Sequence, residues 1–205
     1  MDRGFIYLNK TNFLNNLLYF KKLTQKNLCL VVKANAYGHG LIRMAQAMQE
    51  LSIPRLAVAC VEEAYELRQN NITLPIVLLS GFHHQDQLDF IHQNNIEVVL
   101  HDPWQVDMIS KIPQEASIPV WLKLDSGMHR LGFEASEYKK IYQKLSLLPN
   151  KVDLLGHFSH FAALDPSKES IQSQVTCFNN TTTGLKGLRS MANSMAIMHH
   201  RASHF

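Results

Sequence analysis

Seven short hydrophobic runs alternate along the chain with longer segments whose hydrophobic residues recur at helical spacing. The runs are LCLVV from 28, LAVAC from 56, IVLLS from 76, IEVVL from 96, VWLKL from 120, VDLLGHF from 152 and LRSMANS from 188. Short apolar runs predict buried strands, and their alternation with helical patterns predicts βα units around a parallel sheet.

The segments between these runs carry helix signals. Asp102-Pro103 places an N-cap before a proline at the first helical position. Two apolar helix faces are formed by Leu41, Met44, Ala45, Met48 and Leu51, and by Tyr138, Ile141, Tyr142, Leu145 and Leu148.

Seven strands fit two α/β architectures. A (β/α)8 TIM-type barrel has eight strands and typically about 250 residues, so a barrel here would be incomplete, with about seven βα units and its eighth strand missing. A doubly wound sheet is the alternative that strand count alone leaves open.

Composition narrows the class of protein. At 205 residues we expect one domain over residues 1–205. A net charge of +3 without a basic cluster argues against nucleic-acid binding, and no apolar run is long enough to cross a bilayer. The N-terminus lacks the apolar region of a secretion signal, which predicts a cytoplasmic protein. We expect no metal site, since no thiol or carboxylate accompanies His157 and His160 at ligand spacing, and we expect reduced, buried cysteines.

Residues 31–40 read VVKANAYGHG, and they point to chemistry. Lys33 ends the first apolar run, where parallel α/β folds place their sites, and partial burial there favours a neutral, nucleophilic amine. Lys33 is therefore a candidate for Schiff-base chemistry. Gly38 and Gly40 let the backbone approach a bound group, and the next helix directs its N-terminus at the site, which suits a phosphate. The alternative is a lysine that only reaches solvent.

Three more motifs follow in order: VWLKLDSGMHRLGF at 120–133, HFSHFAALD at 157–165 and LRSMANSMAIM at 188–198. With VVKANAYGHG they resemble the four signatures of the alanine racemases, which bind pyridoxal 5'-phosphate (PLP) on this lysine. The resemblance extends from about Phe5 to Phe205. It implies an isomerase that interconverts L-alanine and D-alanine, supplying D-alanine for peptidoglycan.

The resemblance implies a role for each matching residue. Lys33 is the catalytic residue and would hold PLP, moving the substrate α-proton on one face. Tyr37 resembles the tyrosine that binds the cofactor phosphate, and packing on the next helix is its ordinary alternative. Arg130 would bind both the cofactor and the substrate carboxylate through its planar donor fork, with an exposed loop arginine as the alternative.

Lys123 presents a separate question, because strand alternation places it on one face with Trp121 and Asp125. A lysine inside a sheet or barrel needs a partner or a lowered charge, and an ion pair with Asp125 or another carboxylate is one solution. The resemblance offers another, since many racemases carry a CO2-derived carbamate here. Lys123 is thus a possible carbamylated lysine that would position Arg130.

Further cofactor-binding residues are implied near the end of the chain. His160 matches a histidine that bonds an arginine of the eighth strand beneath the pyridine nitrogen, and a structural histidine is the alternative. Asn193 and Ser194 resemble the phosphate-binding turn after strand seven, although Asn-Ser alone indicates only a turn.

In full-length family members the eighth strand precedes a separate C-terminal β domain, and the resemblance implies that both are absent from residues 1–205. That domain supplies the second base, a tyrosine acting across a homodimer, and none of this chain's six tyrosines is equivalent. We therefore expect a truncated form with weak or no activity that self-associates through its open barrel. The alternatives are a non-catalytic PLP-binding protein, similar to the single-domain barrels of PLP homeostasis, and an inactive remnant.

Overall fold

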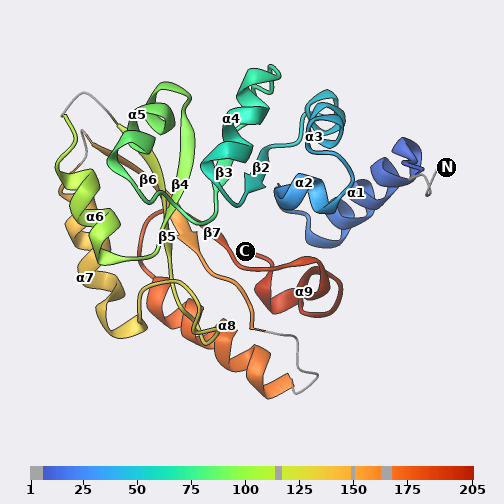
Figure 1. Ribbon diagram of the computed structural model, residues 1–205. Coiled ribbons are helices and arrows are strands. Elements are labelled where there is room, and N and C mark those ends of the chain that lie inside the picture. Colours follow the sequence, from blue (N-terminus) through green and yellow to red (C-terminus); the bar gives the residue numbers. More distant parts are fainter. Residues whose placement is uncertain (1–6, 114–116, 149–150, 163–167) are drawn as a thin grey trace.

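The structure of the protein is a computed structural model that describes residues 7–113, 117–148, 151–162 and 168–205 (Figure 1). Phe5, at the start of the family resemblance, lies outside the described residues. So do Ala163, Leu164 and Asp165 of the third motif.

Seven parallel strands form one sheet in which each strand pairs with the next along the chain. They are β1 (Cys29–Val31), β2 (Arg55–Val58), β3 (Ile76–Leu78), β4 (Ile96–Leu100), β5 (Ile118–Lys123), β6 (Val152–Phe158) and β7 (Leu188–Ser190). A doubly wound sheet would reverse its strand order at a switch point, and this sheet does not. The prediction of an incomplete (β/α)8 barrel is confirmed.

Helices connect the strands and cover one face of the curved sheet (Figure 1). They are α1 (Lys10–Thr24), α2 (Lys33–Tyr37), α3 (Leu41–Glu50), α4 (Val61–Gln69), α5 (Gln85–Gln93), α6 (Pro103–Ser110), α7 (Ala135–Ser146), α8 (Lys168–Thr182), α9 (Ser194–His199) and the 3-10 helix η1 (Arg201–Ser203). The predicted helix signals are confirmed, since Asp102 accepts a hydrogen bond from the Trp104 N–H at 3.1 Å and Pro103 opens α6. None of the helices in the described ranges has the length and apolar character that crossing a membrane requires.

The hydrophobic core has two parts because side chains alternate between the faces of each strand. The larger part lies between the strands and the helices, and it includes Val120, Leu122 and Leu124. The smaller part lies inside the barrel, where Ala57, Val77, Val99 and Trp121 meet. Residues of adjacent strands are level here, since Ala57 pairs with Val77 and Val99 with Trp121. The predicted alternation along β5 is therefore confirmed.

The predictions overestimated the burial of the first strand and the length of the seventh. The first strand is not fully buried, since Val31 is exposed and Leu28, Cys29 and Leu30 are half-buried. β1 pairs only with β2, so its other edge has no strand partner in the described part of the chain. The strand predicted to reach Ser194 ends at Ser190.

The three cysteines are free, but they are half-buried rather than buried.

Candidate functional site at the carboxyl ends of the strands

The predicted site residues lie where the strands end and loops begin. Lys33 follows β1, Lys123 is the last residue of β5, and Arg130, His160 and Asn193 lie in or beside the segments that follow β5, β6 and β7. Parallel strands bring their carboxyl ends to one rim of the barrel, so residues far apart in sequence share one site.

The chain leaves Lys33 in a left-handed turn. Ala34, Asn35, Ala36 and Tyr37 have φ values of 52°, 54°, 52° and 53°, a conformation that costs about 1–2 kcal/mol for each ordinary residue. Hydrogen bonds within the turn offset part of this cost: the Ala36 N–H donates to the Val32 carbonyl at 2.7 Å, and the Gly38 N–H donates to the Ala34 carbonyl at 3.1 Å. The turn therefore depends on specific contacts.

Glu63, from the first turns of α4, supplies one of these contacts. Its carboxylate accepts hydrogen bonds from the Ala34 N–H at 2.6 Å and from the Ala59 N–H at 2.8 Å. Ala34 follows Lys33 directly and Ala59 follows β2, so one side chain joins the ends of two adjacent strands.

The N-terminus of α3 is less open than expected. The side-chain oxygen of Asn35 accepts a hydrogen bond from the Leu41 N–H at 2.7 Å, which occupies the first donor of the helix. A phosphate placed there would have to share the helix end with Asn35. Gly38, by contrast, has a φ of 84° and no atom within 4 Å of the position a Cβ would take, so the backbone is open to a bound group.

Asp125 organises the loop that carries Arg130. Its Oδ1 accepts hydrogen bonds from three successive N–H groups, those of Gly127, Met128 and His129, each at 3.0 Å. The loop returns to the end of β5, where the Phe133 N–H donates to the Lys123 carbonyl at 2.9 Å. The Asp125 carboxylate is thus committed to its own loop.

Lys123 points into the barrel and is only 6% exposed. Among the described residues it forms no ion pair, and its Nζ lies 5.5 Å from the centre of the Phe158 ring. Burial lowers the pKa of Lys123 to about 8, Arg130 adds to the lowering, and Asp125 opposes it. The predicted Lys123–Asp125 ion pair is not formed. The Asp125 carboxylate instead accepts hydrogen bonds from the N–H groups of its own loop.

The pKa of His160 is affected by several charged residues of the site. Burial is the main cause that lowers the pKa of His160 to about 4, so the ring is neutral at neutral pH. Positive charges that act in the same direction belong to Lys123, Arg130 and Lys33. The structure therefore brings four of the predicted site residues together in one positively charged region.

The other predicted residues are less enclosed. Tyr37 is 61% exposed, Arg130 is exposed, and neither side chain forms a hydrogen bond in the described ranges. Asn193 has a structural task, since its Oδ1 accepts the Ala196 N–H at 3.0 Å and caps α9. Ser194 opens α9 and is exposed.

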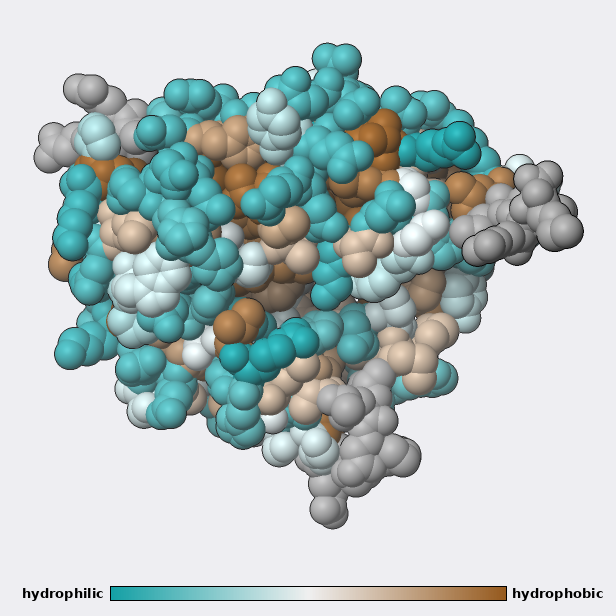
Figure 2. All heavy atoms as spheres, in the orientation of Figure 1, coloured by the Kyte–Doolittle hydropathy of each residue, from teal (hydrophilic) through white to brown (hydrophobic). Residues whose placement is uncertain are grey.

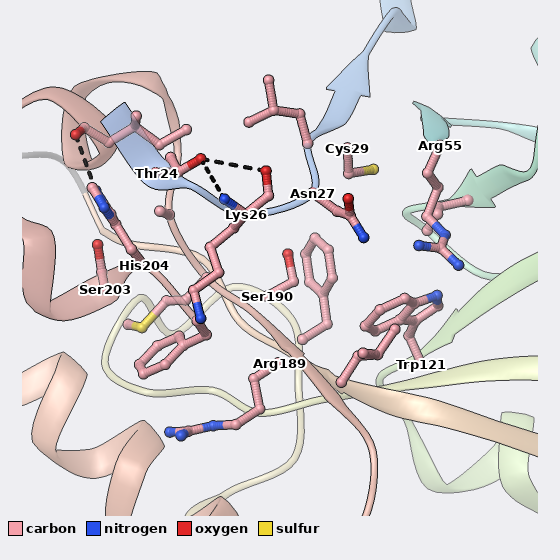
Figure 3. A pocket seen from close by; sticks show the side chains of 18 residues that line it. Thr24, Lys26, Asn27, Cys29, Arg55, Trp121, Arg189, Ser190, Ser203 and His204 are labelled. Carbon is pink, nitrogen blue, oxygen red and sulfur yellow. Dashed lines mark hydrogen bonds between the residues drawn. The ribbon is translucent and has the colours of Figure 1, made fainter. Parts of the chain in front are cut away.

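A cavity of about 320 Å³ lies between β1 and β7, apart from Lys33 (Figure 3). At its back, Trp121 donates its Nε1–H to Glu97 at 2.7 Å, and Arg55 donates to the same carboxylate at 2.7 Å. Arg189 and Ser190 of β7 also line the cavity, and Thr24, Ser203 and His204 lie across from Arg55 in Figure 3. Hydrophobic side chains show in the hollow near the centre of the face in Figure 2, and hydrophilic ones cover most of its surroundings.

Sequence reasoning missed Glu63, Asn35 and the loop role of Asp125. Glu63 lies 29 residues from its partner Ala34 and follows another acidic residue, so no local pattern distinguishes it from a helix-start carboxylate. Asn35 carries a weak signal, since asparagine tolerates the left-handed region and often bonds nearby backbone.

Comparison with known proteins gives one family. The profile of the family described as "Alanine racemase, N-terminal domain" matches residues 8–205. The alanine racemase of Shewanella amazonensis is 38% identical over 174 residues, which are 82% of this chain and 48% of that protein. The alanine racemase of Haemophilus influenzae is 39% identical over 185 residues, 90% of this chain and 51% of that protein.

Solved structures agree with the sequence comparison. The biosynthetic alanine racemase from Pseudomonas aeruginosa superposes with a TM-score of 0.87 at 32% identity, covering 95% of this chain and 54% of that one. The chain spans about half the length of the curated relatives it matches.

Proposed function

Because the chain belongs to the alanine racemase family, we propose that residues 1–205 form the PLP-binding barrel domain of an alanine racemase. On this proposal Lys33 is the attachment point of PLP and the group that moves the α-proton of alanine on one face. The proposed setting is the cytoplasm, with D-alanine supplied for peptidoglycan.

The chemistry of the site fits PLP. The cofactor carries an aldehyde, which reacts with an amine, and a phosphate, which favours positive surroundings. Lys33 supplies the amine, and the positive charges of Lys123, Arg130 and Lys33 all act to lower the pKa of His160. Two carboxylates, Asp125 and Glu63, accept hydrogen bonds from backbone N–H groups, and in the described ranges neither forms an ion pair with Lys33, Lys123 or Arg130. The excess of positive charge around a rim lysine is the observation that carries the proposal.

When bound, PLP withdraws electrons from the substrate and so makes the α-proton acidic. The chain's own residues supply orientation and proton transfer. Arg130, exposed in the loop after β5, is proposed to bind the substrate carboxylate, and Lys33 is proposed to accept or return the proton. Tyr37, Asn193 and Ser194 are proposed phosphate-side residues, and Lys123, with its lowered pKa, is a proposed carbamate site.

Racemisation requires a proton donor on each face of the substrate, and we assign only Lys33 in this chain. We expect alanine turnover to be slower than in a full-length relative by about 10²- to 10⁴-fold, the usual effect of a missing general acid or base. Exchange of the α-proton needs one base only and should persist.

The test is to incubate the chain with PLP and L-alanine in D2O. We expect deuterium to enter the α-position while little D-alanine forms, and Lys33→Ala to abolish the exchange. Lys139→Ala, which removes an exposed lysine of α7, is the control. Bound PLP without exchange would favour the non-catalytic PLP-binding protein, and D-alanine production at the rate of a full-length relative would disprove the need for a second base.

We also propose that the chain self-associates. In the described part no strand pairs with the outer edge of β1 or of β7, and unpaired strand edges invite pairing with another chain. Sedimentation of the purified protein should show dimers or larger species, whereas a single monomeric species at all concentrations would reject this proposal.

A further inference from the structure

Glu63 lies outside the four motifs, yet it holds the peptide that follows Lys33. Its Oε1 accepts the Ala34 N–H at 2.6 Å and its Oε2 accepts the Ala59 N–H at 2.8 Å. Each carboxylate oxygen therefore has its own donor. A hydrogen bond to a charged acceptor is stronger than one between neutral groups.

The position of these contacts matters because the backbone φ angle changes there from negative to positive values. Val32 has a φ of −120°, and Ala34 has a φ of 52°. The peptide between Lys33 and Ala34 is the hinge of this reversal, and its orientation sets the direction in which the Lys33 side chain leaves the backbone. Alanine prefers the right-handed helix, so the sequence KANAY does not favour the observed turn on its own.

The left-handed turn can satisfy only some of its own N–H groups. Ala36 donates to Val32 within the turn, whereas the Ala34 N–H finds its acceptor 29 residues away, on α4. The second bond, to Ala59, ties the same carboxylate to the end of β2, which pairs directly with β1. Glu63 thus fixes the turn relative to the sheet.

We propose that Glu63 is a positioning residue for the PLP-binding lysine: its carboxylate bridges the ends of β1 and β2 and holds the peptide after Lys33 in the left-handed turn. The inference rests on the proposed attachment of PLP to Lys33. It predicts that the charge and both oxygens of Glu63 are needed for selective attachment at Lys33, although Glu63 is not assigned any contact with the cofactor or the substrate.

The test compares Glu63→Gln with Glu66→Gln in the full chain. Glutamine keeps the size of the side chain but offers one acceptor oxygen, so one of the two bonds is lost. Glu66 lies on the same helix and is exposed, and its side chain forms no hydrogen bond in the described ranges, which makes it a matched control for the change in charge.

Two readouts are needed. Amide hydrogen exchange of the PLP-free protein should become faster at Ala34 or Ala59 in Glu63→Gln and stay at wild-type rates in Glu66→Gln. Titration with PLP should show about tenfold weaker binding in Glu63→Gln, as expected when only about a tenth of the free molecules hold the turn in the binding-competent conformation. Visible circular dichroism of the bound cofactor should fall at saturation, because the attached group is no longer held in one orientation.

The outcomes separate this inference from the proposed function. If wild type binds PLP on Lys33 and Glu63→Gln matches Glu66→Gln in exchange, affinity and dichroism, the positioning role is wrong. A lower melting temperature with unchanged affinity and dichroism would also overturn it, since Glu63 would then be structural only. If wild type attaches no PLP at Lys33, the proposed function fails. In that case, unchanged amide exchange at Ala34 and Ala59 in Glu63→Gln would still refute the proposed hydrogen-bond role of Glu63.

Discussion

Replacing Lys123 by methionine should stabilise the protein in the absence of PLP and CO2. The lysine is 6% exposed, lies over the Phe158 ring and has no ion-pair partner in the described ranges. A buried charge without a partner loses its hydration and gains little in return. Methionine has a similar length without the charge, so it should fill the same space at lower cost.

The size of the effect follows from the pKa of Lys123, which falls from 10.5 to about 8 on folding. As the pH drops, the unfolded chain takes up the proton near pH 10.5, whereas the folded protein does so only near pH 8. Stability is therefore lost across this window, and the full cost is present below pH 8. At about 1.4 kcal/mol for each pKa unit, the cost at pH 7 is ~3 kcal/mol.

Urea unfolding at pH 7 and pH 9.5, in buffer free of CO2, measures this cost. Lys123→Met should exceed wild type by about 2–3 kcal/mol at pH 7, and the difference should shrink by about 2 kcal/mol at pH 9.5. Lys139→Met, at an exposed site, should change stability by no more than about 0.5 kcal/mol.

A Lys123→Met protein that is less stable than wild type, or a difference that does not change with pH, would refute the reasoning. Added bicarbonate tests the carbamate separately. If a carbamate forms, bicarbonate stabilises wild type and leaves Lys123→Met unchanged, and electron density three atoms past the amine would show the group directly.

Three further predictions concern the loops and the pH response. Gly132 has a φ of 126°, and an added Cβ would lie 2.6 Å from the Asp125 nitrogen, so Gly132→Ala should cost about 1–3 kcal/mol in urea unfolding; a neutral result would contradict the loop geometry. Asn193→Ala removes the cap of α9 and should cost about 1 kcal/mol, which differential scanning calorimetry can check against Asn193→Asp, a residue that still caps. As the pH drops, the unfolded His160 takes up a proton near pH 6.5 and the folded one only near pH 4, so stability should fall as the pH is lowered through this window; His160→Gln should flatten the fall, and an unchanged pH curve would count against the half-buried, neutral ring.

Much of the fold could be predicted because strand burial and helix periodicity are local patterns. β4 and β6 have the predicted bounds, and α6 begins at the predicted cap. The end of β7 was overestimated because Asn193, within the predicted strand, instead caps α9. An asparagine side chain that bonds nearby backbone favours such an end over a strand.

The site could be predicted less completely, because its geometry depends on contacts between distant segments. The motifs predicted Lys33, Arg130 and His160 as site residues. They could not predict that residues 34–37 form a left-handed turn, since alanine-rich sequence favours the opposite hand and Glu63 acts from 29 residues away. Nor could they predict that the Asp125 carboxylate would bond to the N–H groups of its own loop and form no ion pair with Lys123.

The most direct test of the account is to locate the lysine that attaches PLP. The protein is mixed with PLP, reduced with borohydride, digested and mapped by mass spectrometry. We predict that the label lies on the peptide containing Lys33 and that Lys33→Ala eliminates it, while Lys139→Ala does not. A label spread over exposed lysines, or its retention in Lys33→Ala, would contradict the claim that this rim lysine forms the cofactor site.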